Sequence, residues 1–218
     1  MLAFSEILCR TWRHMISDPL VSNSADNVAA VILAAGNSAR MGSHKHLLRL
    51  KCGRTMPARM ADAAREAGVG SVIVVLGAEA DRVASALNAP PPIEIVINAD
   101  WHRGIGSSIA AGVRAADQPH IDGVLLLLAD QCQVTAEGMH ALIEAGSSAG
   151  VAAACYAGVV GVPAYFDRSH FAALKGLDPA AGAQRILRGL RQVPTIAMPE
   201  AEFDIDTPAD AARFLLTQ

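Results

Sequence analysis

Short apolar runs recur along the chain from Val28 onward, and few polar residues interrupt them. Runs of roughly four to eight residues that are rich in Val, Ile and Leu are typical of strands buried on both faces of a sheet. We therefore predict strands at residues 28–33, 71–76, 93–97, 123–128 and 151–155.

Segments with helical spacing of apolar residues lie between these runs. We predict helices at residues 57–67, 79–87, 107–116 and 135–145, with weaker helical patterns at 181–190 and 208–216. Thr135 stands where its hydroxyl can cap the first turn of a helix. Strands that alternate with helices form right-handed βαβ units, so we expect a three-layer α/β fold with a mostly parallel central sheet.

Residues 1–27 differ from the rest of the chain. A short amphipathic stretch is followed by a segment rich in turn-forming residues, from Ser17 to Asn27. We expect residues 1–27 to be an N-terminal appendage or linker and residues 28–218 to form one domain, a normal size for a single α/β domain.

Charge and cysteine content exclude several classes of protein. The formal net charge is −3 and no basic block exceeds two adjacent residues, which argues against a nucleic-acid partner. The four cysteines form no C-x-x-C pair, so neither a zinc site nor a disulfide framework is indicated. There is no convincing signal peptide, and the longest apolar runs are too short to cross a membrane, so we expect a cytoplasmic protein.

A glycine-containing loop at residues 33–45 directly follows the first predicted strand. Ligands of parallel sheets bind beyond the carboxyl ends of the strands. Gly36 and Gly42 can adopt positive φ and let the backbone approach a phosphate, and Arg40 and Lys45 supply positive charge. The loop matches neither G-x-x-x-x-G-K-[ST] nor G-x-G-x-x-G. The alternative is an ordinary turn with solvated basic residues. We expect the histidines of the chain to be mostly solvated, with His44 and His46 near the phosphate.

Three aspartates are candidate ligands for Mg²⁺. Asp130 follows the predicted strand at residues 123–128, where it can hold the cation against a triphosphate. Asp204 and Asp206 project to the same side if their segment is extended, so that one of them can complete the metal site. The alternative role for these two is to cap a helix that begins at Pro208.

A tryptophan and two serines follow the predicted strand at residues 93–97. Ser107 and Ser108 can cap the next helix and direct N–H groups at a phosphate. The alternative is an ordinary capped helix with Trp101 packed as an anchor. Cys132 could be reactive, but no base stands beside it in the sequence.

Four motifs in order resemble the molybdenum-cofactor cytidylyltransferase group of the MobA-like nucleotidyltransferases. Residues 33–48 match L-A-A-G-x-S-x-R-M-G-x-x-K-x-L-L, and residues 98–109 match N-x-x-W-x-x-G-x-x-S-S-I. Residues 130–134 are similar to D-Q-P-x-V, with Cys132 in place of proline, and residues 204–208 match D-I-D-T-P. The pattern G-D-x-G-A-R of the group is disturbed at residues 176–185, where Asp178 can substitute.

The resemblance implies a Rossmann-like nucleotidyltransferase fold and transfer of CMP from CTP to the phosphate of molybdopterin, with Mg²⁺ as cofactor and a client molybdoenzyme as a further partner. It implies catalytic roles for Arg40, Lys45 and Asp130 and acceptor contacts from Asn98, Trp101 and Gln131. The expected nucleotide-binding residues are Leu33, Ala34, Ala35, Gly36, Ser38, Arg40, Lys45, Gly77, Ser107 and Ser108.

Ala35 favours CTP over GTP, because related guanylyltransferases usually carry a second glycine in this stretch and a methyl group crowds a purine more than a pyrimidine. Three alternatives stay open. They are nucleotidyl transfer to another phosphorylated acceptor, a non-catalytic maturation factor for the molybdenum cofactor, and an oxidoreductase on this fold. The absence of G-x-G-x-x-G counts against the last, and Arg40, Lys45 and Asp130 count against the non-catalytic role.

Overall fold

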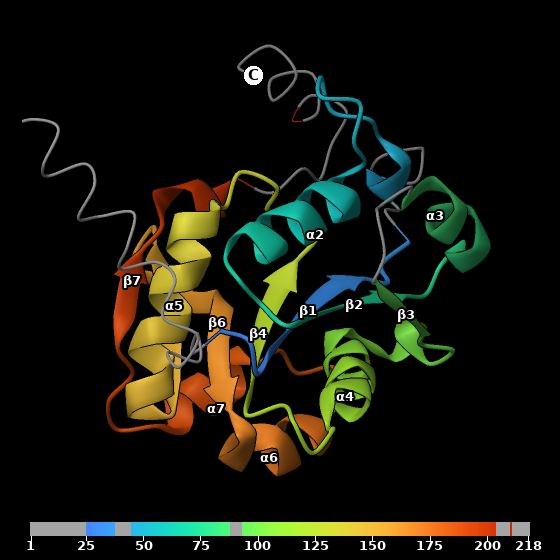
Figure 1. Ribbon diagram of the computed structural model, residues 1–218. Helices are drawn as coiled ribbons and strands as arrows, with labels where there is room; N and C mark the ends of the chain where they lie inside the picture. Colours follow the sequence, from blue (N-terminus) through green and yellow to red (C-terminus); the bar gives the residue numbers. More distant parts are fainter. Residues whose placement is uncertain (1–24, 38–44, 88–92, 204–209, 211–218) are drawn as a thin grey trace, which may run out of the picture.

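Seven strands of the described residues form one sheet through the middle of the molecule (Figure 1). The computed structural model describes residues 25–37, 45–87, 93–203 and 210. The strands are β1 (Val28–Ala34), β2 (Ser71–Leu76), β3 (Glu94–Ile97), β4 (Gly123–Leu128), β5 (Val151–Tyr156), β6 (Val159–Asp167) and β7 (Thr195–Ala197). Their order across the sheet is β3-β2-β1-β4-β6-β5-β7.

Strand β1 lies near the centre of the sheet and pairs in parallel with β2 and β4. Strand β3 extends the parallel part at one edge, and β6 pairs antiparallel with both β4 and β5. The mostly parallel sheet predicted from the sequence is therefore confirmed. Because β1, β2, β3 and β4 run in one direction, the loops that follow them meet at the same edge of the sheet.

Helices cover both faces of the sheet and complete three layers (Figure 1). The α-helices are α2 (Met56–Glu66), α3 (Ala80–Leu87), α4 (Ile105–Ala116), α5 (Ala136–Ala149), α6 (Phe171–Lys175) and α7 (Gln184–Gly189). The short 3-10 turns are η1 (Lys45–Leu47), η2 (Trp101–Arg103), η3 (Arg168–His170) and η4 (Pro199–Glu202). Helices α2, α3 and α5 pack on one face, and α4, α6 and α7 pack on the other.

Every residue of β1 is buried, which explains why its sequence is apolar without alternation. Ile32 belongs to the core under α2 and α5, and Val31 belongs to the core under α4. Full burial of a side chain of this size stabilises the fold by roughly 1.5–3 kcal/mol. The alanines at 61, 63 and 64 of α2 are also fully buried, so the alanine-rich composition serves close contact between helix and sheet.

The predicted strands, and the predicted helices that fall on described residues, occur with small differences at their ends. Of the predicted helix at 208–216 the structure describes residue 210 alone, so that prediction lies outside the described residues. Helix α4 begins at Ile105, two residues before the predicted start at 107, and α7 is shorter than the pattern at 181–190. Thr135 caps α5 as predicted, because its hydroxyl accepts a hydrogen bond from the N–H of Gly138 at 3.2 Å. The folded domain includes Ala25, which is fully buried and accepts a hydrogen bond from the N–H of Val28.

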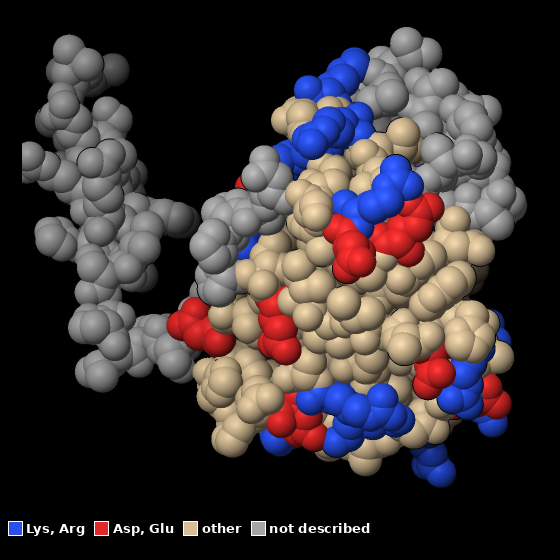
Figure 2. Space-filling model, turned by 90° about the vertical axis from the view of Figure 1, so that its right-hand side faces the viewer, with Lys and Arg blue, Asp and Glu red and all other residues tan. Residues whose placement is uncertain are grey.

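Two features of the described residues concern binding to a membrane or to a nucleic acid. None of the helices that the structure describes is long and apolar enough to cross a membrane. On the face near β3 and α3, the coloured Lys and Arg side chains form small separate groups, several of them beside Asp and Glu (Figure 2). This arrangement differs from the continuous basic surface that proteins use to bind a nucleic-acid backbone.

Candidate active site

A pocket of about 370 Å³ lies at the carboxyl ends of the parallel strands. The end of β1 and the segment after it contribute Leu33, Ala35, Gly36, Asn37, Lys45 and His46. The segment after β3 contributes Trp101, His102, Gly104, Ile105 and Ser108. The end of β4 contributes Leu128 and Asp130. Three segments that are far apart in the sequence therefore build one cavity.

Lys45 and Asp130 form an ion pair in this pocket. The Nζ atom of Lys45 lies 2.6 Å from Oδ2 of Asp130, and the two side chains are 12% and 17% exposed. Parallel pairing of β1 with β4 brings them together, because Leu33 pairs with Leu128 just before the two loops begin. The structure thus pairs Lys45, which follows the glycine-containing loop, with Asp130, the aspartate that we predicted from the sequence as a metal ligand.

Gly36 leaves open space in the pocket wall. A Cβ atom built at this position would have no heavy atom of the described chain within 4 Å. Its backbone is outside the positive-φ region, so the expected left-handed conformation at Gly36 is wrong. The residue instead keeps room for a ligand beside the backbone of the loop, which is the other use of glycine at such sites.

Trp101 packs against the backbone at the end of β2. A Cβ atom at Gly77 would lie 2.5 Å from Cβ of Trp101 and 2.6 Å from the carbonyl oxygen of Ala35. That carbonyl oxygen also accepts a hydrogen bond from the N–H of Ala78 at 3.1 Å. Gly77 therefore holds the tryptophan against the glycine-containing loop through close packing, while Trp101 itself lines the pocket.

Asn98 turns its side chain inward. It is 7% exposed, and its Nδ2 group donates to the hydroxyls of Ser107 at 2.9 Å and Ser108 at 3.0 Å. Its Oδ1 atom accepts from the N–H of Asp100 at 3.0 Å. Asn98 is not among the residues that line the pocket, and its side-chain hydrogen bonds connect segments of the protein; the expected acceptor contact stays a prediction.

The two serines do not cap helix α4, which corrects the sequence prediction. The N-cap position belongs to Gly104, and the Ser107 hydroxyl donates to its carbonyl oxygen at 2.7 Å. The N–H of Gly106 donates to the carbonyl oxygen of Pro179 at 2.8 Å, so this donor of the first turn is already used. Asp178 closes the neighbouring turn by accepting from the N–H of Ala180 at 2.9 Å.

Gln131 is 1% exposed and does not line the pocket. Its Nε2 group donates to the carbonyl oxygen of Ala201 at 2.8 Å, so it joins the loop after β4 to η4 instead of facing an acceptor. The adjacent Cys132 is also buried, and burial raises the pKa of its thiol to about 12. The thiol is therefore protonated at neutral pH, which argues against a reactive cysteine.

His46 lines the pocket beside Lys45, on the side where it was expected near phosphate, but it is 3% exposed and so is buried instead of solvated. The reason is the turn η1, which turns the residue after Lys45 toward the protein. Asn37, His102, Ile105 and Leu128 are further lining residues that the motifs did not indicate. Their positions depend on how three loops meet, and no local pattern of the sequence carries that information.

The described residues contain no cluster of three His, Cys, Asp or Glu side chains that could hold a metal ion. Asp204 and Asp206, and also Ser38 and Arg40, lie outside the described residues. Asp130 supplies one carboxylate in the pocket. This donor set fits Mg²⁺, which is usually bound through one or two carboxylates together with phosphate oxygens and water.

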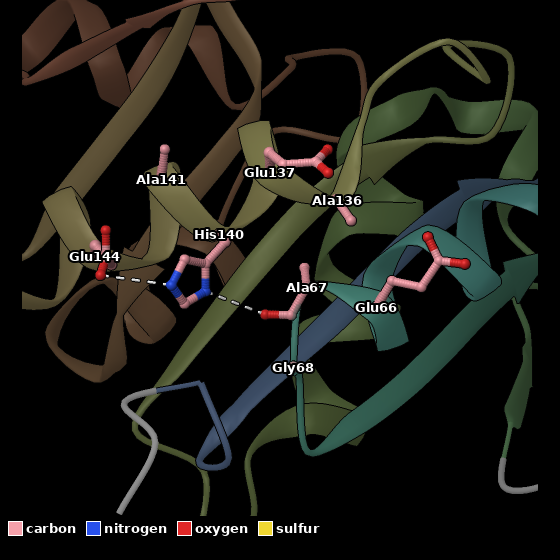
Figure 3. A pocket seen from close by; sticks show the side chains of 8 residues that line it. All are labelled: Glu66, Ala67, Gly68, Ala136, Glu137, His140, Ala141 and Glu144. Atoms are coloured by element: carbon pink, nitrogen blue, oxygen red, sulfur yellow. Dashed lines mark hydrogen bonds and ion pairs between the residues drawn. The ribbon is translucent and has the colours of Figure 1, made fainter. Parts of the chain in front are cut away.

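A second pocket of about 450 Å³ lies between the end of α2 and the start of α5 (Figure 3). Its lining includes Glu66, Glu137 and Glu144, and His140 contacts Glu144 and the carbonyl oxygen of Ala67. It shares no residue with the pocket at Lys45 and Asp130. Its carboxylates repel phosphate, so we do not count it as part of the candidate active site.

A ligand site beyond the carboxyl ends of a mostly parallel sheet is characteristic of nucleotide-binding α/β proteins, and the sheet order and pocket place this chain in that class. Residues 30–195 match the model of the MobA-like NTP transferase domain. The chain therefore belongs to this family.

The chain is similar to the purine catabolism protein PucB of Bacillus subtilis strain 168, with 33% identity over 191 residues that cover 83% of this chain and 92% of PucB. It is 32% identical over 170 residues to nicotine blue oxidoreductase of Paenarthrobacter nicotinovorans, covering 74% of this chain and 81% of that protein. The crystal structure of Rv0371c from Mycobacterium tuberculosis H37Rv is 30% identical with a TM-score of 0.75, covering 88% of this chain and 99% of Rv0371c. The complex of Rv0371c with manganese is 29% identical with a TM-score of 0.72, covering 87% and 98%.

Proposed function

We propose that this protein is a magnesium-dependent cytidylyltransferase that transfers CMP from CTP to the phosphate of molybdopterin and releases pyrophosphate. The observation that carries the proposal is the contact between Lys45 and Asp130 beside the open space at Gly36. A lysine and a carboxylate next to a glycine-containing loop are the groups that a triphosphate and its divalent cation require.

The dimensions of the site fit an extended nucleotide. Strands β3 and β4 are separated by β2 and β1, so they lie about 14 Å apart at the usual spacing between neighbouring strands. The segment with Trp101 and Ile105 follows β3, and Asp130 follows β4. We assign the apolar side near Trp101 to the base and the charged side near Lys45 to the phosphates.

In the proposed reaction, an oxygen of the acceptor phosphate attacks the α-phosphorus of CTP. A new P–O bond forms, the bond to the β-phosphate breaks, and pyrophosphate leaves with the electron pair. Lys45 binds phosphate oxygens as a point charge, and Arg40 in the same loop is proposed to bind them through its planar guanidinium group. Asp130 would hold Mg²⁺, with Asp204 or Asp206 as a further ligand, and the cation would supply positive charge against the phosphates.

The selection of cytosine rests on Ala35, which is buried in the pocket wall under Trp101. Its methyl group limits the space for a larger base. A clash of about one methyl group changes selectivity by roughly 1–3 kcal/mol, so weak activity with GTP is expected. Manganese should replace magnesium, because Rv0371c has been crystallised with it.

The test is release of pyrophosphate by the purified full-length chain with CTP, Mg²⁺ and molybdopterin. We expect release that depends on all three components and that is weaker with GTP. Release with GTP but not with CTP would overturn the base assignment. Release with a sugar or polyol phosphate, but not with molybdopterin, would assign a different acceptor to the same chemistry.

An oxidoreductase is the second candidate, because one relative at 32% identity is a nicotine blue oxidoreductase. The two candidates differ in the ligand that stabilises the folded state. Ligands that bind only the native protein raise its melting temperature by mass action. Stabilisation by Mg²⁺ with CTP supports the transferase, whereas stabilisation by NAD alone supports the oxidoreductase.

A further inference from the structure

Asn98 is buried beside the pocket and all of its side-chain hydrogen-bonding groups have partners inside the protein. Both hydrogens of Nδ2 are used by Ser107 and Ser108, and Oδ1 is used by the N–H of Asp100. A substrate acceptor could bind the Nδ2 group only by breaking one of these two hydrogen bonds, so such a contact would gain little free energy. We therefore look for the role of Asn98 in the segments that its hydrogen bonds connect.

These segments are the end of β3, the turn η2 and the first turn of α4. Asn98 fixes the residue before Trp101 by accepting from the N–H of Asp100. The Ser107 hydroxyl lies 3.0 Å from the carbonyl oxygen of Asp100 and 2.7 Å from that of Gly104, so its single hydrogen is shared between these two acceptors. The N–H of Trp101 itself donates to the carbonyl oxygen of Asn98 at 3.3 Å. The backbone that carries the indole is thus fixed by a network centred on one buried amide.

The position that this network gives Trp101 matters to the pocket. Its Cβ and Cγ atoms would lie 2.5 and 2.6 Å from a Cβ at Gly77, so the side chain fits only because residue 77 is glycine. The carbonyl oxygen of Ala35, in the glycine-containing loop, lies on the same side of Gly77. A shift of the indole would therefore change the wall beside Ala35, where we place the base.

We propose that Asn98 is a positioning residue of the nucleotide site. It acts through Trp101, by holding the turn η2 on the first turn of α4, and it does not itself contact the ligand. The assignment of Trp101 to the nucleotide rests on the proposed function, whereas the effect of Asn98 on the position of the indole does not.

The chain allows an optical test, because Trp12 and Trp101 are its two tryptophans. In the full-length Trp12→Phe protein, Trp101 is the single reporter. We compare Asn98→Ala, Ser107→Ala and the control Asn27→Ala in this background. Asn27 is an exposed asparagine whose Nδ2 group donates to Asp122 at 3.0 Å, so the control loses a similar hydrogen bond away from the pocket.

Without ligand, Asn98→Ala should make the indole emission more accessible to acrylamide and shift it to longer wavelength, whereas Asn27→Ala should change neither. In a titration with CTP and Mg²⁺, the dissociation constant of Asn98→Ala should rise about tenfold, because only a fraction of the molecules keeps the binding conformation. Ser107→Ala should act in the same direction and tests the network if Asn98→Ala does not fold.

Unchanged quenching and unchanged affinity in a folded but less stable Asn98→Ala protein would overturn the proposal and leave Asn98 with a purely structural role. If the parent protein binds no nucleoside triphosphate, the proposed function fails. In that case the quenching comparison alone decides whether Asn98 positions Trp101.

Discussion

At the scale of single residues, Lys45 and Asp130 determine the charge of the pocket. Each neutralises the other at 2.6 Å in a partly buried environment, so neither charge is left without compensation. A triphosphate with its cation offers the same compensation, because phosphate can pair with the lysine and the cation can pair with the aspartate. The ion pair is therefore a contact that a ligand can replace without leaving a charge unpaired.

Asp130→Ala should abolish turnover and leave the fold intact, and Lys45→Ala should mainly weaken triphosphate binding. Loss of one group that stabilises the transition state typically lowers kcat by about 10²–10³-fold. Steady-state kinetics with CTP and isothermal calorimetry measure the two effects. Lys175→Ala is the matched control, since Lys175 forms an equally short 2.6 Å pair with Asp117 outside the pocket. Full activity of Asp130→Ala would contradict the hypothesis that Asp130 binds the metal ion.

Part of the candidate site could be predicted from the sequence, and part of it could not. Lys45 and Asp130 follow buried strands, and the carboxyl ends of parallel strands meet at one edge, so their proximity could be predicted. The inward direction of Asn98 and the burial of His46 could not, because both depend on turns whose geometry is decided by distant packing. The hydrogen bond from Gln131 to Ala201 could not be predicted for the same reason, since its partner is 70 positions away in the sequence.

At the scale of elements, the first turn of α4 and the segment at 178–181 form one unit. A Cβ atom at Gly106 would lie 2.2 Å from the carbonyl oxygen of Asp178 and 2.7 Å from that of Ala181. These atoms belong to the backbone, so they cannot move aside as a flexible side chain would. The segment whose family pattern is disturbed is therefore packed directly on the helix that borders the pocket.

Gly106→Ala should destabilise the protein by roughly 1–3 kcal/mol, which is the usual cost of inserting an atom into a well-packed contact. Urea unfolding followed by circular dichroism measures the change. Gly182→Ala is the control, because a Cβ there would meet only Cγ2 of Ile105, at 3.8 Å. Equal stability of the two variants would show that the segment at 178–181 can move away from α4 without a loss of folding free energy.

The elements of the first two thirds of the chain were predictable, and those of the last third were less so. Strands such as β1 and β4 are apolar at nearly every position because helices cover both faces. Strand β7 has three residues and α6 has five, which is too short for a periodic pattern to develop. Their formation depends on packing against β5 and α4, which the local sequence does not encode.

At the scale of the whole molecule, an ion-pair network stabilises the side of the protein away from the pocket. Asp117, at the end of α4, accepts from Lys175 at 2.6 Å and from Arg168 at 2.7 Å. The hydrogen bond from Lys175, helped by the charges of Lys175 and Arg168, keeps the pKa of Asp117 below its ordinary value although burial opposes this. The network joins α4 to α6 and η3.

This pKa shift predicts the pH dependence of stability. A carboxylate with a lowered pKa in the folded state stabilises the protein above its ordinary pKa of about 3.9, and this contribution is lost as the pH falls through the folded-state value. Asp117→Asn should therefore lower the melting temperature at neutral pH, and its difference from the parent should vanish in strong acid. Scanning calorimetry checks this, with the exposed Asp26→Asn as control. A difference independent of pH would contradict the role of the charge.

Lys45 and Asp130 are 85 positions apart in the sequence, which has a consequence for how the pocket is lost when the protein unfolds. Their contact exists only while β1 and β4 are paired, and Trp101 adds the requirement that β3 is in place. Cooperative unfolding of the central strands therefore removes the cavity. A tightly bound nucleotide will therefore slow amide hydrogen exchange along β1, β2 and β4, far from the atoms that it touches.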